Sequence, residues 1–213
     1  MNKSLTLFLD AAHQIWLPNW FALFSDNENG GFHERLNAQG QPLDLPKRLL
    51  SQCRQIITYA STPDITPYRA KLDEGFQFII DKYHTPKTGG CIFSIEQDSS
   101  PHDSKYDLYT HAFIILTAAT YYKATQNKAA LNFAKTTLNF IKHNFKLDIG
   151  YAESLDDNLK PIEAIRRQNP HMHLMEACIF MYEASNDNDY LDIADEMLAL
   201  FFDKFFDSQT GTL

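Results

Sequence analysis

Glycine-centred turns recur along this chain at nearly constant intervals. Gly30, Gly89, Gly150 and Gly211 each lie in a turn-forming segment, and they are separated by 59, 61 and 61 residues. Self-similarity at a fixed period is typical of repeat architectures, in which one supersecondary unit recurs and its neighbours stack on it. The sequence therefore predicts a chain built from repeated units of about 60 residues.

Two kinds of helix are predicted within each unit. Apolar residues recur at helical spacing over 72–83, 131–145 and 191–205, with charged residues on the opposite faces, as in helices that pack on one side only. The preceding segments, 49–60, 108–122 and 172–182, are apolar nearly all round, which is typical of helices enclosed by others. Strand signals are limited to short pieces such as the one after the second turn. Each unit is thus predicted to hold an inner helix, an outer helix and a glycine turn.

This alternation predicts an all-α fold, an (α/α)6 barrel in which inner and outer helices form two concentric rings. With an opening helix near 5–24, the sequence supplies about seven helices, whereas a closed toroid of this kind needs about twelve. We expect residues 1–213 to form the N-terminal part of one toroid domain, truncated at a repeat boundary. The open edge favours self-association or binding of a missing C-terminal half.

Composition narrows the classes of partner. The chain has 27 acidic and 19 basic residues, a net charge of −8, and its Lys and Arg residues are spread out. Such a surface disfavours nucleic acid and anionic membrane, and no apolar stretch reaches the ~20 residues of a membrane-spanning helix. Three widely separated cysteines, Cys53, Cys91 and Cys178, fit neither a disulfide framework nor a thiolate zinc site. We expect a cytoplasmic protein that binds neither nucleic acid nor membrane.

The segment 166–177 carries polar residues on a predicted buried helix. Burying such groups costs free energy unless a partner satisfies them. Asn169 is predicted as the N-cap of this helix. At about 100° per residue, Asn169, His173 and Glu176 lie in a narrow arc, and His171 points nearly opposite. Two alternatives follow for these residues. Either His173 and Glu176 form an internal hydrogen bond with each other, or the arc belongs to a polar site that lines the ring's central cavity.

The two preceding inner helices carry polar groups as well. Arg54 and Tyr59 stand among apolar residues, and a buried guanidinium needs acceptors such as a carboxylate, carbonyls or a polar ligand. An internal Arg–Glu pair is the structural alternative. Tyr109 and His111 open the next inner helix, where a single His is more often part of the core than catalytic. Because three successive inner helices carry such groups, we expect them to converge on a site inside the ring.

Other catalytic signatures are missing from the sequence. It contains no P-loop, GxGxxG, GxSxG or HExxH motif. The acidic segment 26–30 lacks the twelve-residue loop ending in Glu that binds calcium, so a turn is the better interpretation. His171 and His173 point apart and cannot bind one metal ion from a regular helix. We expect neither a metal nor a cofactor.

Three motifs together carry a family resemblance. They are Arg-Arg-Gln-Asn-Pro-His-Met-His-Leu-x-Glu-Ala at 166–177, Asp-Leu-Tyr-x-His-Ala-Phe at 107–113 and Gly-Gly-Phe-His-Glu at 30–34. With them the whole chain resembles the N-acylglucosamine 2-epimerase family, and most closely its mannose isomerase-like branch. The resemblance implies an (α/α)6 barrel that epimerises sugars or interconverts aldoses and ketoses.

The resemblance also implies roles for individual residues. Arg54 and His173 are implied to contact sugar oxygens, and Glu176 to belong to the same pocket, whereas Tyr109 and His111 occupy a position that varies between branches. Moving a proton beside a sugar carbonyl needs a base, a second acid or base, and positive charge at the developing enediolate oxygen. Histidines suit the first two roles and an arginine the third. The low density of Lys and Arg favours a neutral sugar over a sugar phosphate.

The sequence departs from the family pattern in one respect. The proton-transferring histidines that the resemblance implies lie in the second half of the barrel, one in a His-x-x-Glu-Trp motif, yet the chain has no His after His173. We expect part of the sugar pocket here and the catalytic pair beyond residue 213. Two other classes stay open: a non-catalytic carbohydrate-binding or assembly module, and another toroid enzyme such as a glycoside hydrolase. The latter needs two carboxylates across a cleft, and Glu176 has no obvious partner.

Overall fold

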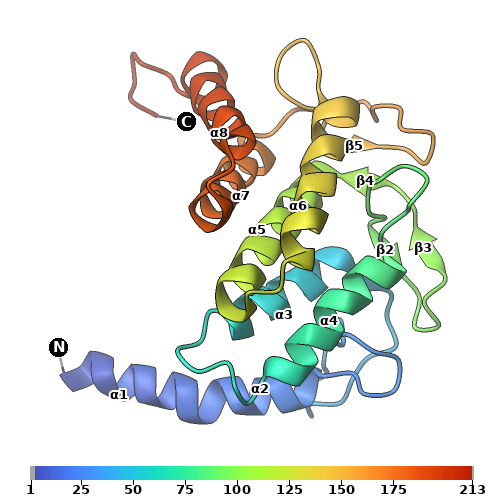
Figure 1. The fold of residues 1–213 in the computed structure, drawn as a ribbon, viewed down its shortest axis with the longest axis vertical. Helices are drawn as coiled ribbons and strands as arrows, with labels where there is room; N and C mark the ends of the chain where they lie inside the picture. Colours follow the sequence, from blue (N-terminus) through green and yellow to red (C-terminus); the bar gives the residue numbers. More distant parts are fainter. Residues whose placement is uncertain (1–2, 213) are drawn as a thin grey trace.

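The computed structural model describes residues 3–212 and is mainly helical (Figure 1). An opening rod consists of α1 (Lys3–Ala11), a π-helical turn η1 (Ala12–Trp16) and α2 (Leu17–Phe24). The inner helices are α3 (Leu49–Ala60), α5 (Leu108–Thr125) and α7 (Gln168–Ser185). The outer helices are α4 (Arg69–Lys82), α6 (Ala129–Phe140) with its π-helical extension η2 (Ile141–Phe145), and α8 (Asn188–Leu200) with η3 (Phe201–Phe205). The predicted alternation of inner and outer helices is confirmed.

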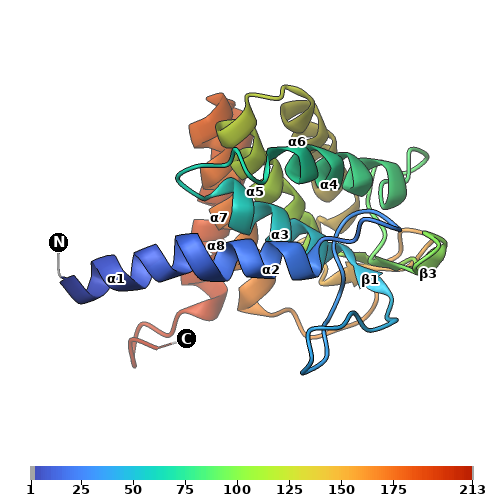
Figure 2. The same cartoon turned by 90° about the horizontal axis from the view of Figure 1, so that it is seen from below.

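The helices follow one another along an arc. Helix α5 packs between α3 and α7, and each inner helix packs on the outer helix that follows it. The opening rod lies at one end of the arc and the α7–α8 pair at the other (Figure 1), and the rod runs across the molecule when it is seen from below (Figure 2). Within residues 3–212 this arrangement is an incomplete all-α toroid with seven helical rods, as the sequence predicted.

The four predicted glycine turns are present. Gly30, Gly89, Gly150 and Gly211 all have left-handed φ values, between +67° and +83°, which glycine adopts without a Cβ penalty. An antiparallel bridge closes each turn: Ser25 with Phe32, His84 with Cys91, Lys146 with Tyr151, and Asp207 with Thr212. The first of these turns follows the opening rod and the other three follow outer helices, and each of the first three sends the chain back toward the next inner helix.

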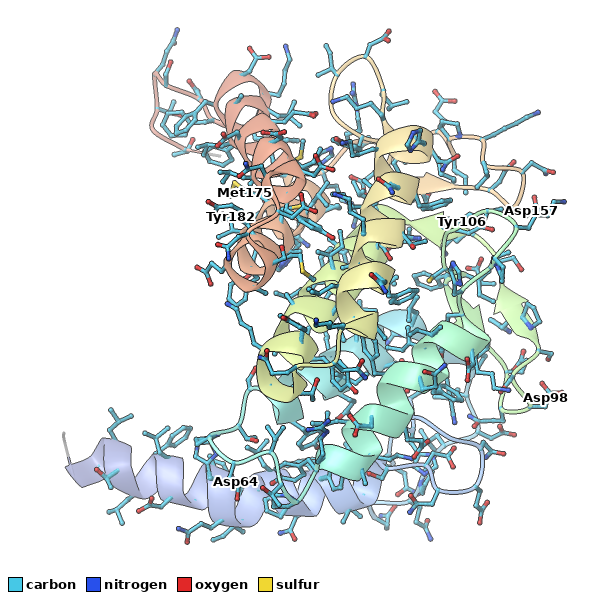
Figure 3. The ribbon with its side chains drawn as sticks, viewed as in Figure 1. Asp64, Asp98, Tyr106, Asp157, Met175 and Tyr182 are labelled. Atoms are coloured by element: carbon cyan, nitrogen blue, oxygen red, sulfur yellow. The ribbon has the colours of Figure 1, made fainter. Side chains whose placement is uncertain are left out.

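Short strands link consecutive repeats. One sheet holds β1 (Lys47–Arg48), β2 (Ser94–Ile95) and β3 (Pro101–Asp103), and a second pairs β4 (Tyr106–Asp107) with β5 (Ser154–Leu155). In both sheets, the strand just before an inner helix pairs with the strand that follows the next glycine turn, as Lys47 does with Ile95 and Tyr106 with Leu155. Figure 3 shows the hairpin residues Asp98, Tyr106 and Asp157 on one side of the molecule, away from Met175 and Tyr182 of α7.

Enclosure differs among the three inner helices. Helix α5 is buried along most of its length, because inner helices flank it on both sides. Helix α3 exposes Arg54 and Thr58, and α7 exposes Ile179 and Phe180, at 39% and 40%. The prediction that all three are enclosed therefore holds for α5 and is wrong for the free faces of α3 and α7, which no further inner helix covers within residues 3–212.

The two ends of the arc leave apolar side chains exposed. Leu138 of α6 is fully buried, whereas Leu198, the equivalent residue of α8, is 45% exposed. At the other end, Leu7 is 62% and Trp20 52% exposed. Among residues 3–212, no helix has both the length and the apolar character needed to cross a bilayer.

The start of α7 differs from the prediction. The helix begins at Gln168, and Arg167 is its N-cap residue, with extended backbone and no side-chain cap bond, so Asn169 is not the N-cap. The Glu153 carboxylate accepts hydrogen bonds from the backbone N–H and the guanidinium of Arg167, which holds that residue extended. Pro170 is tolerated inside the first turn because N–H groups there have no partner within the helix.

Candidate functional site

The inner helices place equivalent positions of successive repeats side by side. Arg54 of α3, Phe113 of α5 and His173 of α7 are separated by 59 and 60 residues, and we call these three residues the inner row. One turn earlier, Leu50, Tyr109 and Asn169 are related in the same way. One turn later come Ile57, Leu116 and Glu176. The candidate site consists of the polar members of these three sets and the aromatic rings between them.

Arg54 and Tyr109 meet across α3 and α5. The Arg54 guanidinium donates a hydrogen bond to the Tyr109 hydroxyl oxygen at 2.8 Å, and its carbon lies 5.9 Å from the centre of that ring. The prediction that this guanidinium is buried is wrong, because Arg54 is exposed on the inner face. The internal Arg–Glu pair is not formed either, since the observed partner is a phenol. A guanidinium carries five donors, so most of its hydrogen-bonding capacity is not used on Tyr109.

His173 and Glu176 meet within α7. The His173 Nδ1 lies 2.7 Å from a Glu176 carboxylate oxygen, with side chains 20% and 43% exposed. The carboxylate only accepts when ionised, so Nδ1 carries the proton of this hydrogen bond. The His173 ring also stands edge-on to Tyr109, with centroids 5.0 Å apart and planes at 84°. The predicted internal hydrogen bond is therefore observed, and it lies on a partly exposed face of α7.

Arg54, Tyr109, His173 and Glu176 thus form one chain of contacts over three helices. A hollow of about 520 Å³ adjoins it at Glu176 and is also lined by the equivalent residues Ile57 and Leu116. Phe180 and Lys123 form part of its wall. A cation, a phenol, an imidazole and a carboxylate beside apolar surface are suited to bind a small polar ligand that also has an apolar face.

His111 lies outside this chain of contacts. It is fully buried, its Nε2 accepts the backbone N–H of Cys91 at 3.1 Å, and its Nδ1 donates to the Asp107 carbonyl at 2.8 Å. Burial lowers the pKa of His111 to about 4, so the ring is neutral. With both nitrogens engaged inside the core, His111 holds the glycine turn against α5.

The same arrangement recurs in the other repeats. The backbone N–H of Tyr151 donates to His171 Nε2 at 3.2 Å. In the first repeat, Gln52 accepts from the N–H of Phe32 and donates to its carbonyl, each at 2.8 Å. We call Gln52, His111 and His171 the latch residues. They fasten each inner helix to the turn that lies twenty residues before it.

The two remaining predicted site residues differ in exposure, since Tyr59 is buried and Asn169 is exposed. Tyr59 is 1% exposed, and its ring packs against Phe21 and Tyr68 at centroid distances of 4.9 and 5.0 Å. It lies on the far side of α3 from Arg54, because five residues turn a helix by about 140° beyond a full turn. Asn169 is exposed in the first turn of α7, at the position equivalent to Tyr109.

Phe113 ends the motif at 107–113 but was not predicted as a site residue. Its ring lies 5.0 Å from Tyr109, 5.0 Å from His173 and 5.0 Å from the Arg54 guanidinium carbon. The signal that could have found it is the repeat spacing, since it stands midway between Arg54 and His173. Among residues 3–212, no group of three or more His, Cys, Asp and Glu side chains is placed to hold a metal ion.

Comparison with known proteins matches the chain to one family and to members of it. Residues 30–213 match the family described as N-acylglucosamine 2-epimerase (GlcNAc 2-epimerase). A cellobiose 2-epimerase of Dictyoglomus turgidum is 26% identical over 92% of this chain and 54% of its own length. A D-mannose isomerase of Thermobifida fusca is 27% identical over 83% of this chain and 46% of its own length.

Solved structures agree on the fold. The cellobiose 2-epimerase structure from Bacillus thermoamylovorans superposes with a TM-score of 0.87 at 23% identity, covering 99% of this chain and 58% of that one. The chain therefore spans about half the length of the relatives it matches.

Proposed function

Because the chain belongs to the N-acylglucosamine 2-epimerase family, we propose that it carries one side of the sugar pocket of an isomerase or epimerase. The proposed reaction is aldose–ketose isomerisation of a mannose-type sugar, or 2-epimerisation, by proton transfer through an enediolate. The proposed sugar contacts are Arg54, Tyr109, His173 and Glu176, with Asn169 at the rim. His111 and Tyr59 are left out because both are buried elsewhere.

The convergence of Arg54, Tyr109 and His173 from three helices supports this proposal. The guanidinium supplies positive charge and several N–H donors where negative charge develops on an enediolate oxygen. The Glu176 carboxylate occupies His173 Nδ1, which leaves Nε2 for a hydrogen bond with a sugar hydroxyl. The Tyr109 ring lies beside these groups and suits the C–H face of a hexose.

We propose that the proton-transferring histidines come from the other half of the ring. On α5 and α7, His111 and His171 have both ring nitrogens bound to the backbone, so neither is available to a substrate. His173 faces the inner side but is tied to Glu176 as a binding group. The residues described here therefore support ligand binding more than they support a complete acid–base pair.

A carbohydrate-binding or assembly half of a split or decayed enzyme is the second candidate. It is favoured by the apolar side chains exposed at both ends of the arc, such as Trp20 and Leu198. Faces of this kind suit a missing C-terminal half, a continuation of the chain or another copy. We propose the same single toroid domain over 1–213 in either case. A cytoplasmic location is also proposed, which three free and buried cysteines fit.

Sugar titration of purified protein tests the proposal. Calorimetry or NMR with mannose, fructose, glucose, N-acetylglucosamine and mannose 6-phosphate should give saturable binding to at least one neutral hexose. Arg54→Ala should weaken this binding about tenfold or more, because a charge-assisted contact contributes about 1.5–3 kcal/mol. Arg69→Ala is the matched control, since Arg69 is an exposed arginine on α4 that pairs with Asp73.

Two results would contradict the proposal. Absence of binding to any hexose would show that these residues do not form a sugar pocket. Isomerisation of mannose by this chain at the rate of a complete family member would show that the proton-transferring pair is present after all.

A further inference from the structure

Phe113 occupies the centre of the candidate site without being a polar contact. It stands between Arg54 and His173 in the inner row, one helical turn after Tyr109 on the same face of α5. Its side chain is 7% exposed, so most of the ring is buried beneath the polar residues of the site. Among residues 3–212, Phe113 is the side chain whose ring contacts all three of Arg54, Tyr109 and His173.

The geometry of these contacts differs around the ring. The Arg54 guanidinium carbon lies 5.0 Å from the ring centre, within the range of a cation–π contact. The His173 ring is tilted by 52° and the Tyr109 ring by 44°, both with centroids 5.0 Å away. Aromatic pairs at such distances prefer tilted or edge-on arrangements, so each contact restricts orientation as well as distance.

We propose that Phe113 is the positioning residue of the sugar pocket, whose ring sets the guanidinium of Arg54 and the imidazole of His173 relative to each other. The inference rests on the proposed function, since a sugar is the ligand for which these groups are aligned. Arg54 and His173 come from helices that are two repeats apart, and both contact the buried Phe113 ring as well as the less buried Tyr109 ring.

The physical reason is side-chain entropy. An exposed arginine has large rotamer freedom, and here the Arg54 guanidinium contacts the Tyr109 hydroxyl and two aromatic rings. If Phe113 loses its ring, Arg54 keeps its contacts with Tyr109, and His173 keeps those with Glu176 and Tyr109, so the ligand must supply the part of their ordering that Phe113 provided. Ordering each side chain at binding reduces affinity several-fold, so loss of the ring should weaken hexose binding about tenfold.

The experiment uses two variants that keep an apolar side chain but remove the ring, Phe113→Leu and Phe113→Met. Their matched control is Phe133→Leu on α6, because Phe133 is 6% exposed and contacts the rings of Phe76 and His84 but no pocket residue. Two readouts are taken on folded protein: hexose affinity, and the NMR cross-peaks between the rings of Tyr109 and His173, which need no ligand.

The expected result is a loss of about tenfold in hexose affinity and weaker Tyr109–His173 cross-peaks in both Phe113 variants, with neither change in Phe133→Leu. Unchanged cross-peaks and affinity in the Phe113 variants would overturn the inference, as would equal losses in the control. If the native chain binds no hexose, the proposed function fails. The cross-peaks then still decide whether Phe113 orients the cluster.

Discussion

The latch residues and the inner row lie two positions apart on the same three helices, yet they behave differently. The pairs are Gln52 with Arg54, His111 with Phe113, and His171 with His173. Every latch residue is buried, and each accepts a backbone N–H from the glycine turn that precedes its helix. The inner row instead combines a cation, an arene and an imidazole, and its exposure varies from one repeat to the next.

The difference shows which constraint acts on each set. A latch position faces a buried N–H group that must be satisfied, so only side chains with an acceptor at the right reach are suitable. The inner-row residues instead contact one another through their side chains, so no backbone group of a turn requires a particular side chain there. Substitutions in the latch should therefore change the free energy of unfolding, and substitutions in the inner row should change ligand binding.

The largest expected effect comes from His111→Leu. This change leaves the Cys91 N–H and the Asp107 carbonyl without their side-chain partner in the core, and should lower the free energy of unfolding by about 3 kcal/mol. Urea unfolding followed by circular dichroism measures it. The rescue variant is His111→Gln, because Gln52 performs the same function in the first repeat. If Gln at 111 is as damaging as Leu, the two latches are not equivalent.

Acidification should weaken the same latch. Burial lowers the pKa of His111 to about 4 from 6.5. The unfolded chain therefore binds a proton at higher pH than the folded chain, and stability is lost as the pH falls from about 6.5 toward 4. Between about pH 7 and pH 5 the loss due to His111 should be about 2 kcal/mol.

The His111→Gln variant isolates this effect. Burial also lowers the pKa values of His33 and His84, so the native chain alone reports a sum. The difference between native and variant stability should shrink by about 2 kcal/mol over that pH range. A difference that does not change with pH would mean that His111 is protonated equally in both states.

A smaller effect is expected at the turn that the third latch holds. Gly150 has φ +67°, and a Cβ there would lie 3.2 Å from His171 Nε2 and 3.0 Å from Leu200. Gly150→Ala should cost about 1.5 kcal/mol, from backbone strain plus this crowding. Gly211→Ala is the control with φ +69° and no heavy atom within 4 Å of the added carbon, and strain alone should cost about 1 kcal/mol. Equal losses in urea unfolding would mean that crowding of the latch is negligible.

Much of the fold followed from local sequence pattern. The glycine spacing predicted the repeats, and the predicted inner helix 49–60 matches α3 residue for residue. The start of α7 was misplaced because Glu153, a residue of the preceding turn segment, holds Arg167 extended. Such a contact between distant segments leaves no mark on local propensity.

The candidate site was predicted in part. The spacing of His173 and Glu176 correctly placed both on one face, and the hydrogen bond between them is observed. The exposure of Arg54 was mispredicted, because burial depends on what stands opposite a helix rather than on the helix itself. Tyr59 and His111 were grouped with the site since a single helix, read alone, does not reveal which of its faces meets the next repeat.

The smallest effect on stability is expected for Tyr109→Phe, which tests the contacts of the inner row rather than those of the latch residues. The change removes the oxygen that accepts the Arg54 hydrogen bond at 2.8 Å but keeps the ring that His173 contacts edge-on. Because the bond lies on an exposed face, the free energy of unfolding should change by less than about 0.5 kcal/mol. Hexose affinity should still fall about threefold, since Arg54 loses one of its anchors. The control Tyr122→Phe, near the other end of α5, should change neither stability nor hexose affinity. A stability loss above about 1 kcal/mol in Tyr109→Phe would assign the Tyr109 hydroxyl to the fold rather than to the pocket.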